Sequence, residues 1–487
     1  MNTTESQDTL AVISQVIGGQ RRPGDDTRSR PVINPANDTS LGTLPFASAD
    51  DVADALRAAQ TAQADWQQTP AVQRARLLRA TADAVRQRRE AIAQRIALEL
   101  GKPLAQGRAE VDTAAEMFDW AAEESRRCFG QVIPTRAGGL QQRTELRPVG
   151  VVAAMSGWNA PIITPARKIS GALGAGCAIV LKPSEETPGV SLLLQDALDE
   201  AGVPPGVVNL VFGDPAAIAR QLIESPIVRA FSFTGGIAVG RQLGALAAQH
   251  LKRATLELGG HAPVLVFDDV DVAQVARTAA LAKFRNAGQV CTSPTRICVH
   301  RRVFDVFTGA FVEQVRALRV GNPCDASVDM GPLKNPARLA AIESLVLDAR
   351  QRGLAVAAGG QRLPGPGCFF EPTVIIDPHR QARVSHEEPF GPIAVLIPFE
   401  TEAEAIAEAN RLPVGLAAYA FTRDLARAHR LAEQVRCGSL ALNDWAVSMP
   451  ETPFGGVLDS GYGLEGGWQG LREFMQVVTV RTGQVGL

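Results

Sequence analysis

Short β-rich runs alternate with helical stretches in the middle of the chain, and this alternation constrains the fold more than any other feature. The five runs are Val151–Met155, Ala178–Leu181, Val207–Phe212, Ala230–Phe233 and Thr255–Leu258. Strands that alternate with helices form a mostly parallel sheet with helices packed on both of its faces. We therefore predict an α/β fold built on a doubly wound sheet.

A second alternating series begins at Pro263 and predicts a second α/β domain. The strands expected in it are Val264–Phe267, Arg296–Val299, Ile393–Pro398, Ala418–Phe421 and Ser439–Leu442. Apolar residues at helical spacing predict helices between these strands, and two earlier helices at residues 51–61 and 71–100. We expect residues 1–130 and 150–259 to form the first domain, and residues 260–460 to form the second.

Two remaining segments have the pattern of exposed strands. The polar, alternating segment Gln131–Arg147 contains a Gly138-Gly139 turn and predicts a hairpin, and Gln476–Arg481 predicts a short strand. Exposed strands without a partner tend to pair edge to edge with another chain. We assign residues 131–149 and 461–487 to an arm that joins copies of this chain as a homodimer or homotetramer.

Composition argues against several other classes of function. A formal net charge of −2 over 487 residues provides no field for nucleic acid or an acidic membrane. No apolar run approaches the ~20 residues that span a bilayer, and the acidic N-terminus is unlike a secretory signal. The seven dispersed cysteines and six histidines have no disulfide or metal-ligand spacing. We expect a cytoplasmic protein with reduced thiols and no metal.

Three side chains with catalytic chemistry lie beside tight backbone turns. Cys291 follows Gly288 and small residues, which permit close approach of a ligand. Glu257 ends a predicted strand, where a carboxylate faces the ligand crevice and can act as a general base. Asn159 follows the first strand, and its amide can donate to a developing oxyanion. Each feature alone also fits a buried thiol, a surface glutamate or an ordinary turn.

Three further motifs suit a dinucleotide. The segment Gly235–Gly240 follows a strand, where a helix N-terminus can receive a phosphate, although it lacks the G-x-G-x-x-G order. Lys182 and Glu185 follow another strand and could hold the hydroxyls of an adenosine ribose. Glu388 and Phe390 fit a contact to a second ribose and a ring packed on a nicotinamide.

Together, the blocks resemble the aldehyde dehydrogenase superfamily over about residues 15–485. The blocks that carry the resemblance are Trp158-Asn159, Lys182-Pro183-Ser184-Glu185, Phe233-Thr234-Gly235, Glu257-Leu258-Gly259-Gly260, Gly288-Gln289-Val290-Cys291, Glu388-Pro389-Phe390-Gly391-Pro392 and Pro453-Phe454-Gly455-Gly456. The resemblance implies a doubly wound cofactor domain, a second α/β catalytic domain and a β oligomerisation arm. It also implies oxidation of an aldehyde to a carboxylate through a thioester, with NAD or NADP as hydride acceptor.

The resemblance also implies a role for individual residues. Cys291 matches the nucleophile, Glu257 the base that activates water and Asn159 an oxyanion donor, while Lys168 and Glu465 match a proton-relay pair. Cofactor contacts are implied at Trp158, Lys182, Glu185, Thr234, Gly235, Gly236, Gly240, Leu258, Glu388 and Phe390. NAD is favoured because the Glu185 carboxylate repels a 2′-phosphate and accepts from a 2′-hydroxyl.

Some positions depart from the family pattern without removing a catalytic group. Gly236 replaces a hydroxyl residue that often touches a cofactor phosphate, and His261 replaces a common lysine or asparagine. Ser156-Gly157 replaces a turn that usually contains proline. Ala160 replaces a common aromatic residue, which opens space beside the oxyanion donor.

Three positions point to the class of aldehyde. Arg167 and Arg285 stand where enzymes for simple aliphatic aldehydes tend to carry aromatic residues, and Ser448 stands at another such position. Guanidinium groups recognise carboxylates through paired hydrogen bonds. Succinate-semialdehyde dehydrogenases look similar here and near Trp120, and Phe454 completes the expected substrate contacts. We expect an aldehyde with a carboxylate, or a sulfonate, a few carbons away.

Several alternatives remain open from the sequence. The arginines could instead pair with nearby acids, in which case neutral aliphatic or aromatic aldehydes would be the substrates. A CoA-acylating relative generally lacks the base found at Glu257, and a non-enzymatic relative would be expected to lack the nucleophile, base or oxyanion donor. A cysteine hydrolase without a cofactor would produce no NADH from an aldehyde.

Overall fold

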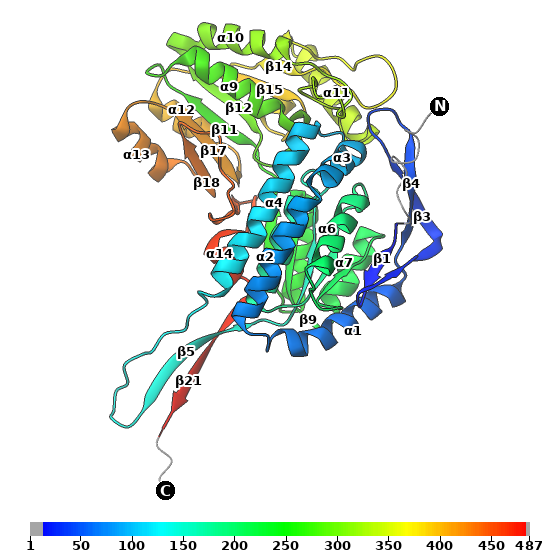
Figure 1. Ribbon diagram of the computed structural model, residues 1–487. Helices are drawn as coiled ribbons and strands as arrows, with labels where there is room; N and C mark the ends of the chain where they lie inside the picture. Colours follow the sequence, from blue (N-terminus) through cyan, green and yellow to red (C-terminus); the bar gives the residue numbers. More distant parts are fainter. Residues whose placement is uncertain (1–12, 484–487) are drawn as a thin grey trace.

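The computed structural model describes residues 13–483 and contains both predicted sheets (Figure 1). Residues 1–12 and 484–487, the ends of the predicted first domain and arm, lie outside the described residues. The first sheet has the strand order β2-β1-β8-β7-β6-β9-β10-β20, and β8 to β10 in this order run parallel. Along the sheet the bounds are Gln20–Arg22, Gln15–Ile17, Val208–Leu210, Ile179–Lys182, Val151–Met155, Val228–Gly235, Arg253–Leu258 and Gly461–Tyr462.

Helices cover both faces of this sheet because the side chains of β6 alternate between two apolar cores. Val152 and Ala154 belong to the core formed with α2 to α6, whereas Val151, Ala153 and Met155 belong to the core formed with α1, α7 and α8. The bounds of α1 to α8 are Ala49–Trp66, Ala71–Gln87, Arg89–Leu100, Leu104–Ser125, Ile163–Ala175, Pro188–Glu200, Pro215–Glu224 and Ile237–Gln249. This arrangement is the doubly wound architecture that the sequence predicts.

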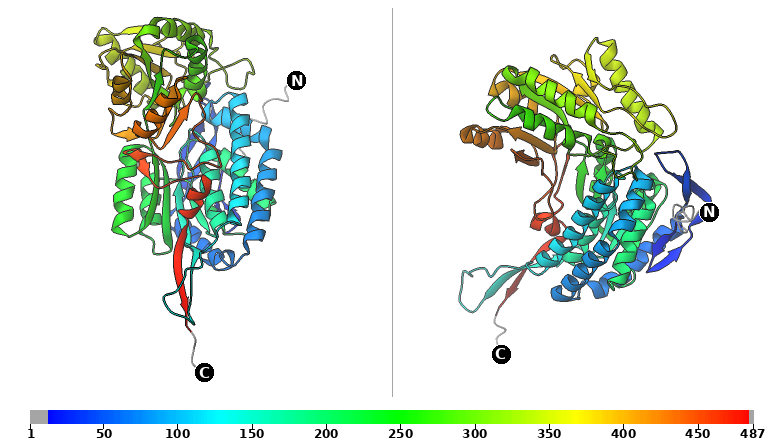
Figure 2. Two further views of the ribbon diagram at one scale, coloured as in Figure 1. Left: turned by 90° about the vertical axis from the view of Figure 1, so that its left-hand side faces the viewer. Right: turned by 45° about the horizontal axis from the view of Figure 1, so that its top comes forward.

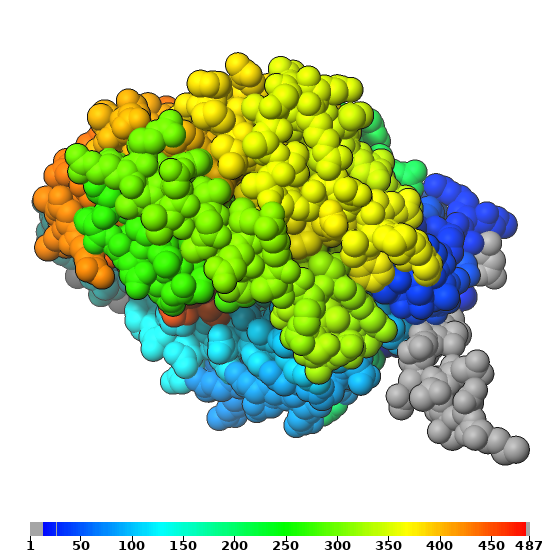
Figure 3. Space-filling view, turned by 90° about the horizontal axis from the view of Figure 1, so that it is seen from above, coloured from blue at the N-terminus to red at the C-terminus, as the bar shows by residue number. Residues whose placement is uncertain are grey.

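The second sheet has the strand order β13-β14-β15-β12-β11-β17-β18, with only the edge strand β13 antiparallel to its neighbour. Along the sheet the bounds are Ala355–Ala358, Thr373–Ile376, Ile393–Phe399, Pro294–His300, Ala262–Val266, Ala417–Phe421 and Ser439–Leu442. The bounds of α9 to α13 are Val272–Phe284, Phe304–Ala317, Pro336–Gln351, Glu402–Ala409 and Leu425–Gln434. Seen from above, this part of the chain covers much of the first domain (Figure 3).

An arm of two strands projects away from both sheets (Figures 1 and 2). Strand β5, Gln141–Pro148, pairs antiparallel with β21, Met475–Thr482. The prediction of a hairpin within Gln131–Arg147 is confirmed in part, because Val132 forms an antiparallel bridge with Arg143 and the Ile133 N–H donates to the Gln142 carbonyl at 2.8 Å. The longer pairing of β5, however, is with a partner from the far end of the chain. The two strands that seemed to lack partners pair with each other, and a local pattern carries no information about such a distant partner.

Two further assignments need correction. The predicted helix 71–100 is two helices, α2 and α3, separated at Arg88. Its apolar spacing continues across the break because both helices pack against α4. Residues 461–472 were assigned to the arm, but β20 pairs with β10 of the first sheet, and α14, Gly467–Arg472, contacts α4 and α5.

Some short elements had no counterpart among the predictions. The hairpin β3–β4 near the N-terminus, the edge strand β13 and its neighbour β14 are examples. The bounds of β3, β4, β16 and β19 are Asp25–Ile33, Ser40–Phe46, Val414–Gly415 and Val457–Leu458. Three short 3-10 helices lie at Arg285–Gly288, Arg301–Val303 and Arg383–Ser385.

Candidate active site

A cavity of about 730 Å³ lies where the carboxyl ends of the first sheet meet loops of the second domain. Its walls include residues that directly follow β6 and residues that end β9 and β10. The opposite wall comes from the loop between α9 and β12 and from the loop before β15. Carboxyl ends of parallel strands form one edge of a sheet, so the cavity occupies the usual ligand crevice of this fold.

Cys291 lies on a tightly folded loop that lines the cavity. Before it, Asn286 and Ala287 adopt left-handed conformations with φ of 51° and 52°, and Gly288 follows with φ of 71°. A Cβ at Gly288 would lie 2.1 Å from the carbonyl oxygen of Gly391, so only glycine fits there. Gly288 was predicted to permit close approach of a ligand, but it permits close approach of the Gly391 main chain instead. The resulting tight fold of the loop places the Cys291 thiol at the cavity wall.

Burial raises the pKa of the Cys291 thiol well above its usual range, and the carboxyl groups of Glu257 and Glu388 raise it further. The free thiol is therefore the stable form in this environment. A base must take up its proton when the sulfur acts as a nucleophile.

Glu257 is the nearest candidate for that base. It lies near the end of β10, is 3% exposed, and its Oε1 has no hydrogen-bond partner among the described residues. Burial and the charge of Glu465 raise the pKa of Glu257 to about 7. A carboxyl group with this pKa can both accept and release a proton near neutral pH.

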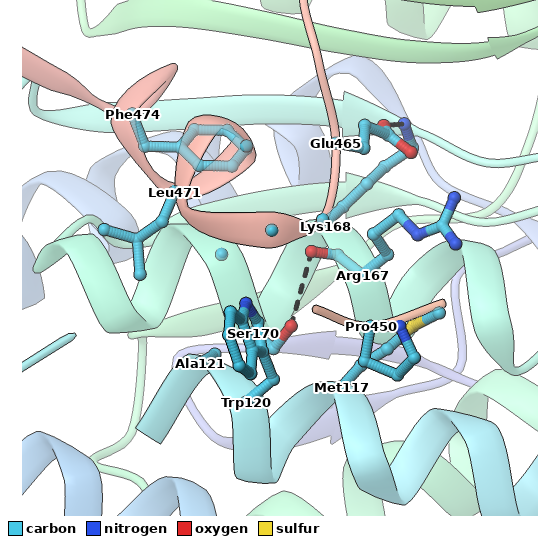
Figure 4. Close-up of a pocket in the computed structure, with 14 residues that line it drawn as sticks. Met117, Trp120, Ala121, Arg167, Lys168, Ser170, Pro450, Glu465, Leu471 and Phe474 are labelled. Atoms are coloured by element: carbon cyan, nitrogen blue, oxygen red, sulfur yellow. Dashed lines mark hydrogen bonds and ion pairs between the residues drawn. The ribbon is translucent and has the colours of Figure 1, made fainter. Parts of the chain in front are cut away.

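A buried ion pair lies behind Glu257. Lys168 of α5 is paired with Glu465, and its ammonium donates to the hydroxyl of Ser232 at 2.8 Å. The same hydroxyl donates to Glu465 at 3.1 Å. In Figure 4 the Lys168 side chain reaches toward Glu465, away from Trp120. The predicted pair is thus present as a connected hydrogen-bond network, within electrostatic reach of Glu257.

Asn159 lies on the loop after β6 and lines the same cavity. Its main-chain carbonyl accepts hydrogen bonds from the Lys102 ammonium at 3.0 Å and from the Asn286 side-chain amide at 3.1 Å. The second bond joins the loop after β6 to the loop that carries Cys291. The structure therefore brings together all three residues that the sequence selected as nucleophile, base and oxyanion donor.

Two arginines contribute positive charge to the cavity wall. Arg167 is 7% exposed, donates to the Ser448 hydroxyl at 2.7 Å and lies over the Phe454 ring at 4.8 Å. Its Nε has no hydrogen-bond partner, and no described carboxylate forms an ion pair with it. Arg285 is exposed and has neither a hydrogen bond nor an ion pair within residues 13–483. The expectation that these arginines pair with nearby acids finds no contact to support it.

Trp120 is not one of the residues that line the large cavity. It lines a separate cavity of about 20 Å³ with Met117, Ser170 and the inner part of Arg167 (Figure 4). The Arg167 guanidinium points away from Trp120 in this view. A direct substrate contact at Trp120 stays a prediction, since Trp120 lies on α4 outside the lining of the large cavity.

The other end of the cavity is lined by glycines, by one hydroxyl and by aromatic rings. The predicted residues found there are Trp158, Thr234, Gly235, Gly236, Leu258, Glu388 and Phe390. The Trp158 and Phe390 rings meet edge to face with centroids 5.5 Å apart. Burial raises the pKa of Glu388 to about 8.

The aldehyde dehydrogenase family model matches residues 22–480. The chain belongs to this family. A succinate-semialdehyde dehydrogenase from Burkholderia pseudomallei has a crystal structure that matches with a TM-score of 0.95 and 38% identity, covering 99% of this chain and 100% of that chain. The predicted family and fold are therefore confirmed.

Two relatives align with nearly the whole of this aldehyde dehydrogenase. The 4-(hydroxymethyl)benzenesulfonate dehydrogenase of Comamonas testosteroni is 45% identical over 460 residues, which cover 94% of this chain and 96% of that protein. The NADP⁺-dependent succinate-semialdehyde dehydrogenase of Escherichia coli is 38% identical over 462 residues, which cover 95% and 96%. The chain is an NAD(P)-dependent aldehyde dehydrogenase, as predicted.

The residues of this aldehyde dehydrogenase fit a dinucleotide at the glycine-lined end of the cavity. The hydroxyl of Thr234 is buried and has no partner among the described residues. A Cβ at Gly236 would meet nothing within 4 Å, and Gly236 caps α8 without a side-chain hydrogen bond. The first amides of α8 are thus open to an anion such as a phosphate.

Other predicted cofactor residues lie outside the cavity lining. Lys182 and Glu185 form a buried ion pair with each other. Gly240 is buried, and a Cβ there would lie 2.4 Å from Leu258. A direct cofactor contact at Gly240 stays a prediction, and the small size of this residue permits the packing of α8 against β10.

Sequence reasoning missed several charged or polar residues of this aldehyde dehydrogenase. Lys102, Glu110 and Asn286 line the cavity, and each forms a hydrogen bond with the main chain of the loop after β6. Buried Lys283 donates to the Ser293 hydroxyl and to the Gly391 carbonyl at 2.9 and 3.0 Å. A lysine within an apolar helical face was the signal that could have identified Lys283.

Within residues 13–483, no helix is long and apolar enough to cross a membrane. No group of three or more potential metal-binding side chains occurs in this part of the enzyme either.

Proposed function

We propose that Cys291 is the nucleophile of this aldehyde dehydrogenase, that Glu257 is its base and that Asn159 holds the oxyanion. As the sulfur bonds to the aldehyde carbon, Glu257 accepts the thiol proton, and the carbonyl electron pair moves to oxygen. The Asn159 amide stabilises that oxyanion. The raised pKa of the thiol and the unpartnered Oε1 of the neighbouring carboxyl support this assignment.

Bound NAD(P)⁺ would supply the hydride acceptor. Loss of a hydride from the former aldehyde carbon to that acceptor would leave a thioester on Cys291. Thr234, Gly235 and Gly236 would hold the dinucleotide, with Glu388 and Phe390 at the nicotinamide end. Glu257 then removes a proton from a water whose oxygen attacks the thioester carbon. The carbon–sulfur bond breaks, which gives the carboxylate product and frees Cys291.

The Lys168–Glu465 pair would carry the proton away from Glu257. Ser232 joins the two charged groups by hydrogen bonds of 2.8 and 3.1 Å, so the three residues form one network behind Glu257. The positive charges of Lys168 and Arg167 favour the ionised form of Glu257. Both effects would help the base to act repeatedly.

We further propose that the substrate aldehyde carries an anionic group on its distal end. The observation that carries this proposal is the Arg167 guanidinium, which is buried at the cavity wall and has no carboxylate partner in the described chain. A buried charge without a partner is costly, and a bidentate anion would relieve that cost. Ser448 and the exposed Arg285 lie on the same cavity and extend the site.

Two forms of anionic aldehyde have support. Relatives named succinate-semialdehyde dehydrogenases support a short aliphatic semialdehyde. The relative named for 4-(hydroxymethyl)benzenesulfonate supports an aromatic aldehyde with a sulfonate. The small side chains of Ala105, Ala109 and Ala160 on the cavity wall leave width for such a ring.

Four aldehydes in two matched pairs test both proposals. Succinate semialdehyde pairs with butanal, and 4-formylbenzenesulfonate pairs with benzaldehyde. We expect Arg167→Ala to lower kcat/KM about 10- to 100-fold more for the anionic member than for the neutral member, which loses only the effect of the Arg167 charge on Glu257. Arg285→Lys retains the charge and should be milder than Arg285→Ala. Equal losses for both members of a pair would contradict recognition of the anion.

We propose NAD⁺ as the preferred cofactor. Glu185 is already paired with Lys182, so a 2′-phosphate could pair with the Lys182 ammonium only by displacing the Glu185 carboxylate. A ribose hydroxyl can instead donate to that carboxylate.

We propose that copies of this enzyme associate through the arm. Strand β21 has one partner, β5, and β18 is an edge strand of the second sheet. Free edges of this kind pair between chains. Sedimentation should give a homodimer or homotetramer, and deletion of residues 476–487 should give the monomer mass. A full-length monomer would contradict the proposal.

A further inference from the structure

Lys102 and Glu110 form a buried ion pair on the wall of the catalytic cavity. Lys102 directly follows α3, and Glu110 lies on α4. Neither residue has a part in the proton transfers described above. Two ionised groups are costly to bury, and further hydrogen bonds to each of them offset part of that cost.

The pair holds two peptides of the short loop that carries the Asn159 amide, that of Asn159 itself and that of Ile162 at the start of α5. The ammonium of Lys102 donates to the main-chain carbonyl of Asn159 at 3.0 Å. The carboxylate of Glu110 accepts a hydrogen bond from the main-chain N–H of Ile162 at 3.3 Å. Each charged group therefore forms an ion pair with the other and also a hydrogen bond that fixes one peptide of the loop after β6.

The loop that carries the nucleophile reaches the same carbonyl. The Asn286 side-chain amide donates to the Asn159 carbonyl and to the Gln289 carbonyl, each at 3.1 Å. Asn286 keeps a left-handed conformation, with φ of 51°, that few residues adopt. The Asn159 carbonyl is thus a junction between Lys102 on one side and the Cys291 loop on the other.

We infer that Lys102 and Glu110 are positioning residues, which hold the Asn159 amide in register with the Cys291 sulfur. This inference rests on the proposed role of Asn159 as the oxyanion donor. Because a donor displaced by a fraction of an ångström loses much of its effect on a transition state, fixing the peptide that carries it favours the reaction.

Direct recognition of the substrate anion by Lys102 is the competing explanation. Glu110 neutralises Lys102, and the ammonium already donates to two acceptors, whereas Arg167 and Arg285 have no carboxylate partner in the described chain. The arginines therefore suit an anion better. The two roles differ in outcome, because a positioning lysine matters equally for anionic and neutral aldehydes.

A double-mutant cycle with Lys102→Met and Asn159→Ala tests the inference. We expect Lys102→Met to lower kcat about 10- to 100-fold for both succinate semialdehyde and butanal. In the Asn159→Ala background, the same change should lower kcat less than about twofold, because the donor it positions is gone. Glu110→Gln keeps an acceptor for Ile162 and should have a smaller effect.

The cycle separates this inference from the proposed function. If Asn159→Ala alone left kcat unchanged, the oxyanion role itself would be wrong. If Asn159→Ala were damaging but Lys102→Met cost the same in both backgrounds, only the positioning role would fail. A loss confined to succinate semialdehyde would identify Lys102 as an anion-binding residue instead.

Lys252→Met is the matched control for removal of a lysine that caps carbonyl groups. Lys252 donates to the carbonyls of Ser225 and Val228 at 2.8 and 2.7 Å, at the amino end of β9 and therefore opposite the cavity. Its replacement should leave kcat within about twofold in both backgrounds. Far-UV circular dichroism and the melting temperature of each variant confirm that a folded enzyme is compared.

Discussion

Burial decides the chemistry of individual residues in the cavity. Glu257 and Glu388 are both enclosed by the protein, and burial raises the pKa of the first to about 7 and of the second to about 8. The Cys291 thiol beside them is raised well above its usual pKa by the same cause. In such a site the Cys291 thiol keeps its proton until a base removes it, and Glu257 can gain or lose a proton near neutral pH.

Hydrolysis of the thioester should rise with pH through about 7. Glu257 acts as a base only when it is deprotonated, so the rate should fall about tenfold per unit below its pKa and level off above it. Single-turnover release of the carboxylate from pH 5.5 to 9 measures this rate. A profile without a rise between pH 5.5 and 7.5 would contradict the assignment, and Glu257→Gln should show only a slow residual rate.

Glu185→Gln should shift the cofactor preference toward NADP⁺. Loss of the carboxylate removes its repulsion of a 2′-phosphate and frees the Lys182 ammonium to pair with that phosphate. We expect the ratio of kcat/KM for NADP⁺ to that for NAD⁺ to rise about 5- to 50-fold. The control is Glu200→Gln, because Glu200 at the end of α6 is paired instead with Arg88. An equal rise in both variants would sink this explanation.

At the scale of helices and strands, the catalytic groups lie on loops held by rigid elements. The Cys291 loop is fixed by three consecutive left-handed residues and by the close approach of Gly288 to the Gly391 carbonyl. Asn159 and Glu257 are placed by the ends of β6 and β10. Loops supported by strands can carry catalytic groups with little loss of position.

Gly288→Ala should displace the Cys291 loop. The added Cβ would meet the Gly391 carbonyl at 2.1 Å, and the left-handed φ of 71° adds backbone strain. We expect a loss of about 1–3 kcal/mol in the free energy of unfolding and a lower kcat. Thermal denaturation and steady-state rates measure both effects.

Gly309→Ala is the control for that change. Gly309 lies within α10, and a Cβ there would meet nothing within 4 Å. The same substitution should therefore raise stability by about 0.5–1 kcal/mol and leave kcat unchanged. If Gly288→Ala behaved like this control, the account of the loop would be wrong.

The sequence was informative where local patterns determine structure. The strands β6 and β18 have the predicted bounds, since apolar β-rich runs mark buried strands. The pairing of β5 with β21 could not be predicted, because strand partners distant in sequence leave no local trace. The same reason explains why Lys102 was missed: its contact with Asn159 exists only in the folded chain.

At the scale of the whole molecule, the site exists only because two sheets meet. Asn159 and Glu257 come from the first sheet, whereas Cys291 comes from a loop of the second domain. The Asn286 amide bonds across this junction to the Asn159 carbonyl. The family and reaction class follow from blocks of sequence, but the convergence of these three residues is a property of the assembled fold.

The most direct test of that convergence is to trap the acyl group on the enzyme. Glu257→Gln, mixed with aldehyde and NAD⁺, should release one NADH per site in a single burst and then stall. The burst should be slower than the first turnover of the native enzyme, because the thiol has lost its base. Mass spectrometry of the digested protein should find the acyl group on the peptide that contains Cys291. A variant that turns over steadily without a burst, or that carries the adduct on another cysteine, would contradict the account.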